Sequence, residues 1–176
     1  MKSFHLACLS GIWLVASCIP ASPVGFVLTS SGFSEGGTIP DKYVYRLEGQ
    51  CNGDNFSPPL SWTGAPDGTQ SFAILVTDPD GGDWVHWLQF NIPASMTSLP
   101  ESVGGPGTGI KGTNNFGESG YGGPCPPSGT HRYIFTLYAL DMTLSLSEGA
   151  SRTQFESAID GHVLGKAQLT GLRSRD

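Results

Sequence analysis

The sequence has few charged residues. Asp, Glu, Lys and Arg make up only 14% of the chain, and the nine basic residues form no run. Nucleic-acid-binding proteins normally cluster basic side chains on one face, so a net charge of −6 argues against a nucleic-acid partner. Low charge combined with 25 glycines and 13 prolines also argues against a helical bundle or a disordered chain. This composition is typical of a β-rich protein with many turns.

Motifs for metal binding and covalent catalysis are missing or lie in the wrong context. The sequence has no H-x-x-x-H or C-x-x-C pair, so we predict no metal and no other cofactor. Gly32 to Gly36 matches G-x-S-x-G, and Gly107 to Gly112 matches G-x-G-x-x-G, but neither is placed between a strand and a helix. We therefore predict a protein that is not an enzyme. A hydrolase using Asp and His as acid and base, or a bound metal, is an alternative, although no activated nucleophile is apparent in the sequence.

The first residues predict export. Residues 1–22 read as a leader with a short tether, and residues 23–176 as a single domain. Lys2 precedes an apolar run, Leu6 to Ala16, which is too short to remain as a membrane-spanning helix.

The end of this leader allows two processing routes. Val15-Ala16-Ser17-Cys18 resembles the bacterial lipobox, which implies a lipid on Cys18. The protein would then be a periplasmic or cell-surface lipoprotein, and the lipid anchor would be its only membrane contact. Ordinary cleavage near Ala21 or Ser22, which would give a secreted protein, is the alternative.

Two of the four cysteines fall in the predicted domain. Cys8 and Cys18 belong to the leader, which leaves Cys51 and Cys125, each in a loop rich in Gly, Pro or Asn. An exported protein can keep a disulfide, so we predict a bond between this pair. Two buried free thiols are the alternative.

Alternating apolar residues predict strands over 71–78, 85–92 and 132–140, with a last short strand over 167–172. In the second of these, the pattern places His86, Leu88, Phe90 and Ile92 on one face. A capping-box pattern from Ser151 to Gln154 predicts one helix. Many strands, long Gly/Pro loops and little helix predict a mainly β protein, an antiparallel β-sandwich with a few peripheral helices.

Polar side chains gather where these strands begin or end. They are Asp78, Asp80, His86, His131 and Tyr133. Imidazoles and a phenol can donate hydrogen bonds to an anion, and the backbone N–H groups of Gly120, Gly122 and Gly123 could approach it closely. Each residue also has a structural interpretation: a buried histidine, turn-capping aspartates, a core tyrosine and simple turns.

The order of these residues resembles the two signature regions of the phosphatidylethanolamine-binding protein family, also called Raf-kinase-inhibitor-like proteins, in its bacterial branch. The first region is Asp78-Pro79-Asp80 followed by Trp84-Val85-His86-Trp87, and the second is Gly117 to Asp141 with His131-Arg132-Tyr133. The resemblance extends from about Ser30 to Leu172.

That resemblance implies an antiparallel β-sandwich with a small surface cavity for phosphate-like anions. Matched one at a time, the cavity residues are Asp78, Asp80, Trp84, His86, Gly123, Pro126, Pro127, His131 and Tyr133. The segment Gly81-Gly82-Asp83 departs from the family's usual small residue and proline, which affects the shape of the rim.

These observations predict an exported binding protein whose ligand is a small anion, either phosphate or a phosphorylated head group. The alternative is an inhibitor or scaffold that uses the rim of the pocket on a protein partner, such as a protease or a kinase.

Overall fold

The computed structural model describes residues 25–103, 105 and 107–175, so Cys8, Cys18 and the predicted leader lie outside the described residues. Six strands form the main sheet, in the order β2 (Gly37–Thr38), β11 (Val163–Arg175), β10 (Gly129–Leu140), β6 (Ser71–Asp78), β7 (Trp84–Pro93) and β9 (Ile110–Lys111). All neighbours in it are antiparallel except β2 and β11, which are parallel.

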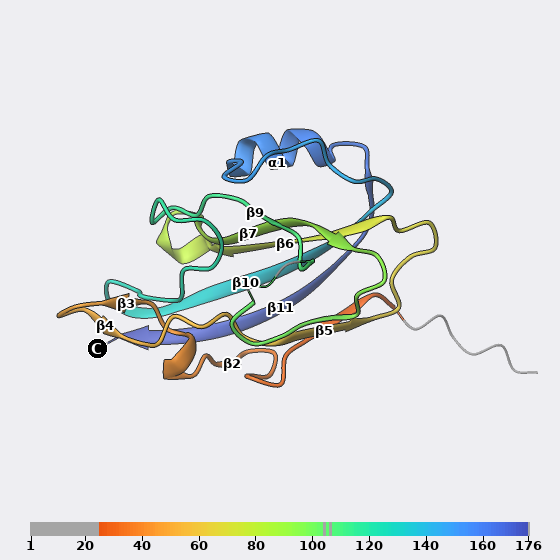
Figure 1. Ribbon diagram of the computed structural model, residues 1–176. Helices are drawn as coiled ribbons and strands as arrows, with labels where there is room; N and C mark the ends of the chain where they lie inside the picture. The colour runs from red at the N-terminus through yellow and green to blue at the C-terminus, as the bar shows by residue number, and fades with distance from the viewer. Residues whose placement is uncertain (1–24, 104, 106, 176) are drawn as a thin grey trace, which may run out of the picture.

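Smaller elements cover both faces of this sheet (Figure 1). A second sheet has the order β1 (Val27–Thr29), β5 (Leu60–Thr63) and β8 (Ser98–Leu99), and a hairpin joins β3 (Arg46–Leu47) to β4 (Cys51–Asn52). The single described α-helix, α1 (Arg152–Ile159), lies on the opposite face, and η1 (Asp41–Tyr43) and η2 (Pro79–Gly81) are short 3-10 turns. The predicted mainly β sandwich is confirmed. Within the described ranges, no helix is long and apolar enough to cross a bilayer.

Strict alternation along β6 and β10 sorts apolar side chains into two cores. Phe72, Ile74 and Val76 of β6 pack between the two sheets, while Ala73 and Leu75 pack under α1. The same division holds in β10, where the core between the sheets receives Tyr133, Phe135, Leu137 and Ala139. Both strands are buried on two faces, as predicted for the centre of a sheet.

Strand β7 breaks the alternation twice, which makes one prediction wrong. Val76 pairs with Trp87 but Thr77 pairs with Val85, so His86 is an extra residue, and a second irregularity lies between Gln89 and Ile92. Each extra residue in a β-bulge reverses the facing of the side chains that follow. Consequently Leu88 and Phe90 face α1, whereas Ile92 packs between the sheets and shares no face with them.

The C-terminal strand is longer than predicted. β11 is paired with β10 from Val163 to Arg175, although the sequence predicted a strand only over 167–172. Gly165 lies within this strand and pairs with Ala139. A Cβ at this position would lie 2.8 Å from Pro66, so the close approach of Pro66 requires glycine. The predicted helix and its capping box are confirmed, with Ser151 accepting from the Gln154 N–H.

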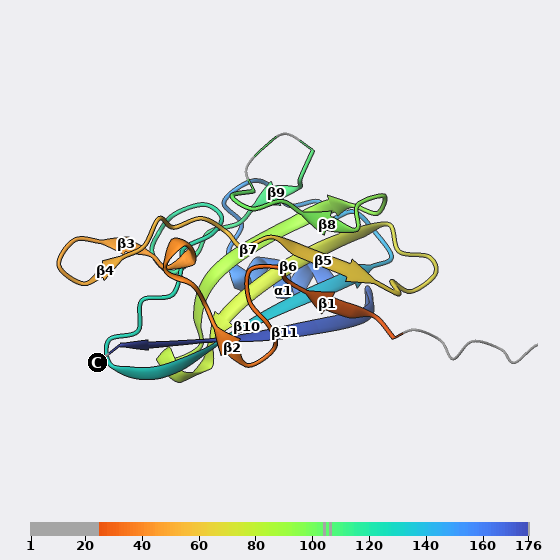
Figure 2. The ribbon, with the colours of Figure 1, turned by 90° about the horizontal axis from the view of Figure 1, so that it is seen from below.

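The two ends of the long axis differ in what they carry. The hairpin β3–β4, η2 and the C-terminal end of β11 lie together at one end, and the described chain begins beside β1 at the other (Figures 1 and 2). The predicted site residues at the ends of β6 and β10 lie at the hairpin end.

Candidate functional site

Asp78 is the best-anchored polar side chain of the site. It ends β6 and is 4% exposed. Its Oδ1 accepts the backbone N–H groups of Asp80 (3.0 Å) and Gly81 (2.9 Å), which forms the cap of η2. Its Oδ2 lies 2.7 Å from Nδ1 of His131. All of these bonds hold the carboxylate in one orientation at the strand end.

Asp80 has a different partner. Its Oδ2 accepts from the backbone N–H and Nε of Arg132, both at 2.9 Å, and its Oδ1 accepts from Nη2 at 2.7 Å. The side-chain and backbone hydrogen bonds from Arg132 lower the pKa of Asp80 from 3.8 to about 2. The structure thus places Asp80 in an exposed ion pair that joins η2 to β10, beside the cavity and not in its wall.

His86 is 3% exposed and occupies the first bulge of β7. Its Nδ1 lies 2.7 Å from the Gly122 carbonyl oxygen and 3.1 Å from that of Gly123. Because both partners only accept, Nδ1 must carry the proton, and in the neutral ring Nε2 is left with a lone pair. Burial lowers the pKa of His86 from 6.5, opposed by the Gly122 carbonyl and the charge of Asp78. Near neutral pH the ring therefore offers an acceptor.

The glycine N–H groups predicted as anion donors are engaged within the protein. The N–H groups of Gly120, Gly122 and Gly123 donate, in that order, to Gly112 O, His86 O and Asn55 Oδ1.

Close packing explains why glycine is needed in this loop. A Cβ at Gly122 would lie 2.5 Å from the Phe116 ring, and one at Gly123 would lie 2.2 Å from the Tyr43 carbonyl oxygen. The loop can therefore pack against Phe116 and the Tyr43 backbone, in a position where its carbonyls reach His86. Its glycines fix the tautomer of the histidine, which the sequence did not reveal.

Tyr133 lies behind His86, with ring centroids 5.0 Å apart in an edge-to-face arrangement. It is 1% exposed, and its hydroxyl has no hydrogen-bond partner among the described residues. Burial, and next the charge of Asp78, raise the pKa of Tyr133 well above 10.0. The hydroxyl therefore remains protonated and can donate.

A cavity of about 360 Å³, here called the His86 cavity, opens beside these groups. Its lining residues come from the hairpin, the ends of β6 and β7, and the long loop before β10: Leu47, Gln50, Asp78, Gly81, Trp84, His86, Phe116, Cys125 and Pro127. Among the residues predicted for the site, four line it: Asp78, Trp84, His86 and Pro127. The others do not: Asp80, Gly123, Pro126, His131 and Tyr133.

Sequence reasoning missed several lining residues. Phe116 immediately precedes the glycine-rich segment, and an aromatic side chain beside such a loop was a usable signal. Leu47 and Gln50 lie in the β3–β4 hairpin, and no motif marked them. They reach the cavity because Cys51 and Cys125 form the predicted disulfide, with Cα atoms 5.9 Å apart.

The His86 cavity suits a small ligand that has a polar head and an apolar body. Trp84, Phe116 and Leu47 supply apolar walls, while Asp78 and His86 supply the polar end. None of the described residues that line it is Lys or Arg. The described residues contain no group of three or more His, Cys, Asp or Glu placed to hold a metal ion.

Comparisons with known proteins agree on one family. The sequence profile of the phosphatidylethanolamine-binding protein family matches residues 29–174. A UPF0098 protein of Methanothermobacter thermautotrophicus is 46% identical over 154 residues, covering 84% of this chain and 98% of its own. A UPF0098 protein of Chlamydia trachomatis is 40% identical over 156 residues, covering 85% and 99%.

Solved structures give the same result. The crystal structure of YbcL of Escherichia coli, described as a member of the mammalian PEBP family, superposes with a TM-score of 0.80 at 34% identity, covering 86% of this chain and 99% of YbcL. A putative phosphatidylethanolamine-binding protein homologue of Chlamydia trachomatis, CT736, superposes with a TM-score of 0.77 at 38% identity, covering 86% and 99%.

Proposed function

This chain belongs to the phosphatidylethanolamine-binding protein family, and we propose that it is a non-enzymatic binding protein whose His86 cavity takes up a small phosphate-like anion together with one proton. The observation that carries the proposal is the fixed tautomer of His86, whose Nε2 is free to receive a proton in a cavity of about 360 Å³. Among the described residues that line it there is no Ser, Thr, Lys or free thiol, which supports binding over catalysis by a hydroxyl, amine or thiol nucleophile.

Proton uptake follows from the absence of other cations in the lining. A dianion beside the Asp78 carboxylate would be repelled, whereas a monoanionic phosphoryl group can donate its own O–H to Nε2. Proton transfer to Nε2 gives an equivalent charge-assisted bond. In either form the complex holds one proton more than the free protein and a free dianion. The apolar walls then contact whatever the phosphoryl group is attached to.

We expect phosphate affinity to rise as pH falls. Because the pKa of His86 is lowered from 6.5, the free protein has a neutral ring at pH 7.5, and a binding step that takes up one proton strengthens by at most about tenfold per pH unit. The increase should continue down to about pH 6 and level off below it, because the free phosphoryl group has a second pKa of about 6 and then already carries the proton. Calorimetric titration with phenyl phosphate between pH 5 and 8 measures this slope.

The substitution His86→Asn tests the role of Nε2. Asn also carries a nitrogen on Cγ, so it can still donate to the carbonyls of Gly122 and Gly123 while Nε2 is lost. We expect affinity at pH 6 to fall about thirtyfold, the equivalent of one charged hydrogen bond of about 2 kcal/mol.

The matched control is His162→Asn, because His162 pairs with Asp141 at 2.9 Å on the surface away from the cavity. Equal affinity in the two variants would overturn the proposal. If a protein partner binds equally well to wild type and His86→Asn, and Trp84→Ala abolishes that binding, the pocket-rim alternative is correct. Trp84 is 39% exposed at the rim, which is the observation that favours this second candidate.

Export with lipid attachment at Cys18 is part of the proposal, although Cys18 lies outside the described residues. The described chain begins at the end of the domain opposite the β3–β4 hairpin (Figure 2), and Leu47 and Gln50 of that hairpin line the His86 cavity. The domain is at least as long as β11, whose 13 residues extend roughly 43 Å at about 3.3 Å each. A cavity at the end of the domain far from Gly25, where the described chain begins, supports a ligand from the surrounding solution over a head group of the anchoring bilayer.

Replacing Cys18 by Ala should move the protein from the membrane fraction to the soluble fraction, because the lipid would be its only membrane contact. Fractionation and immunoblotting of wild type and variant measure this, with Cys8→Ala as the matched cysteine control. A wild-type protein already soluble would support ordinary signal-peptide cleavage.

A further inference from the structure

A second cavity adjoins the Cys51–Cys125 disulfide, as the His86 cavity does. Its volume is about 240 Å³, and we call it the Arg175 cavity. Cys51 is part of its wall, Cys125 is part of the wall of the His86 cavity, and Gln50 lines both. Its basic side chains are Arg173 and Arg175, at the C-terminal end of β11.

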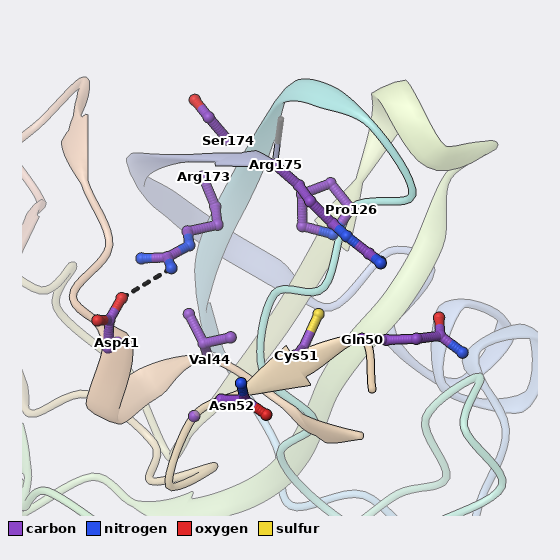
Figure 3. Close-up of a pocket in the computed structure, with 10 residues that line it drawn as sticks. Asp41, Val44, Gln50, Cys51, Asn52, Pro126, Arg173, Ser174 and Arg175 are labelled. Atoms are coloured by element: carbon purple, nitrogen blue, oxygen red, sulfur yellow. Dashed lines mark ion pairs between the residues drawn. The ribbon is translucent and has the colours of Figure 1, made fainter. Parts of the chain in front are cut away.

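Arg173 is held in place at one side of this cavity. Its Nη2 lies 2.7 Å from Asp41 Oδ1, and its Nη1 donates to the Ile39 carbonyl oxygen at 3.0 Å. Figure 3 shows this ion pair at one side of the cavity. The Arg173 side chain is only 24% exposed, whereas that of Asp41 is 82% exposed. Arg173 is therefore preorganised, and its counter-charge is mostly in solvent.

Arg175 extends in a different direction, past Pro126 toward Gln50 (Figure 3). It has no ion pair or hydrogen bond from its side chain within the described part of the chain. The amides of Gln50 and Asn52 likewise have no side-chain hydrogen bond with any described residue, and each offers two N–H donors. The lining thus contains two guanidinium groups, two free amides and one carboxylate.

This excess of donors contrasts with the rest of the molecule. The chain has a net charge of −6 and only nine Lys and Arg residues, two of which line a single small cavity. The neighbouring His86 cavity has none in its lining. From this concentration of fixed positive charge and unused donors, we infer that the Arg175 cavity is a second binding site, specific for a small oxyanion such as sulfate, phosphate or a carboxylate.

The two sites differ in how they respond to pH. Arginine remains protonated throughout the physiological range, so the Arg175 cavity needs no proton uptake. Sulfate is the sharper probe because it stays a dianion from pH 5 to 8. Its affinity for the Arg175 cavity should be unchanged over that range, whereas binding at the His86 cavity weakens as pH rises.

The test is a titration of the protein with sodium sulfate at constant ionic strength, followed through the side-chain N–H signals of Arg173, Arg175, Asn52 and Gln50 by NMR at pH 6 and pH 8. We expect saturable shifts with one dissociation constant at both pH values. Arg175→Gln should weaken binding at least tenfold, because it removes the charged fork but keeps a polar side chain. Asp41→Asn should strengthen it, because a competing carboxylate is removed.

Lys166→Gln is the matched control, since it removes the same charge from the other end of β11. An equal loss in Lys166→Gln and Arg175→Gln, or shifts that rise linearly without saturation, would show only general screening and overturn the inference. His86→Asn should leave sulfate binding here unchanged, so failure of this site and failure of the His86 site are distinguishable. Acetate in place of sulfate decides between tetrahedral anions and carboxylates.

Discussion

Replacing Cys51 and Cys125 together by serine is expected to lower the free energy of unfolding by about 4 kcal/mol. The disulfide closes a loop with a sequence separation of 74, and in the chain-entropy account a cross-link of that span restricts the unfolded state by this amount. For a domain of this size the melting temperature should fall by about 10 °C. Urea denaturation and thermal melting of the double variant measure the two quantities.

Wild-type protein treated with a strong reductant is the matched comparison, because it loses the same bond without any substitution. Both samples should show the same loss. A change below about 1 kcal/mol in both would mean that hydrogen bonds such as Tyr45 N–H to Pro124 O hold the loop without the disulfide. In that case the two cavities that adjoin the bond should also keep their affinities.

Strands with uninterrupted alternation could be predicted from the sequence alone. β6 and β10 are such strands, and the facing of Phe72 and Tyr133 followed from the two-residue period. The helix was predictable because Ser151 and Gln154 form a local capping box that requires no tertiary contact.

The conformation of His86 could not be predicted in the same way. A bulge adds one residue to a strand, and nothing in the local pattern around His86 reveals where the partner strand skips. The tautomer depends on the carbonyls of Gly122 and Gly123, which are 36 and 37 residues away. A sequence therefore indicates that the histidine is present at a strand end, but not which nitrogen faces the ligand.

The roles of the glycines could not be predicted from the sequence either. A glycine that exposes its N–H to a ligand and a glycine that permits close packing look alike in sequence. Gly123 belongs to the second kind because a Cβ would collide with the backbone of Tyr43, a contact created only by the fold. Asp80 was predicted to line the cavity, but Arg132 on β10 binds both of its carboxylate oxygens and Asp80 lies outside the lining. Which of these residues line the cavity depends on their contacts in the fold, and the residue type alone does not reveal it.

Asp78→Ala is expected to destabilise the protein by about 3 kcal/mol, a cost in the range measured when one partner of a buried, hydrogen-bonded pair is removed. The carboxylate is buried and has three partners: the N–H groups of Asp80 and Gly81, and Nδ1 of His131. Without it, the η2 turn loses its cap and Nδ1 of His131 loses its hydrogen-bond partner. Urea denaturation at pH 7 measures the loss.

Asp80→Ala provides the matched control, because it removes a carboxylate two residues away that is bonded to Arg132 on the surface. Exposed ion pairs contribute little to stability, so its denaturation curve should nearly overlay that of wild type. Similar losses in the two variants would mean that the η2 turn, and not the buried Asp78–His131 pair, carries the stabilisation.

Ligand binding tests the charge of Asp78 separately from its structural role. In Asp78→Asn the side chain keeps its shape and one acceptor oxygen for the η2 turn but loses its negative charge. That charge opposes an anion and favours protonation of His86, so its removal has two opposing effects. At pH 5, where the phosphoryl group already carries its proton, removal of the repulsion should dominate and phenyl phosphate should bind more tightly than to wild type. At pH 8 the lost support for the histidinium should dominate and the order should reverse. A crossover between these pH values is the expected result of calorimetric titration, and parallel pH profiles for the two proteins would show that Asp78 acts only as a structural anchor.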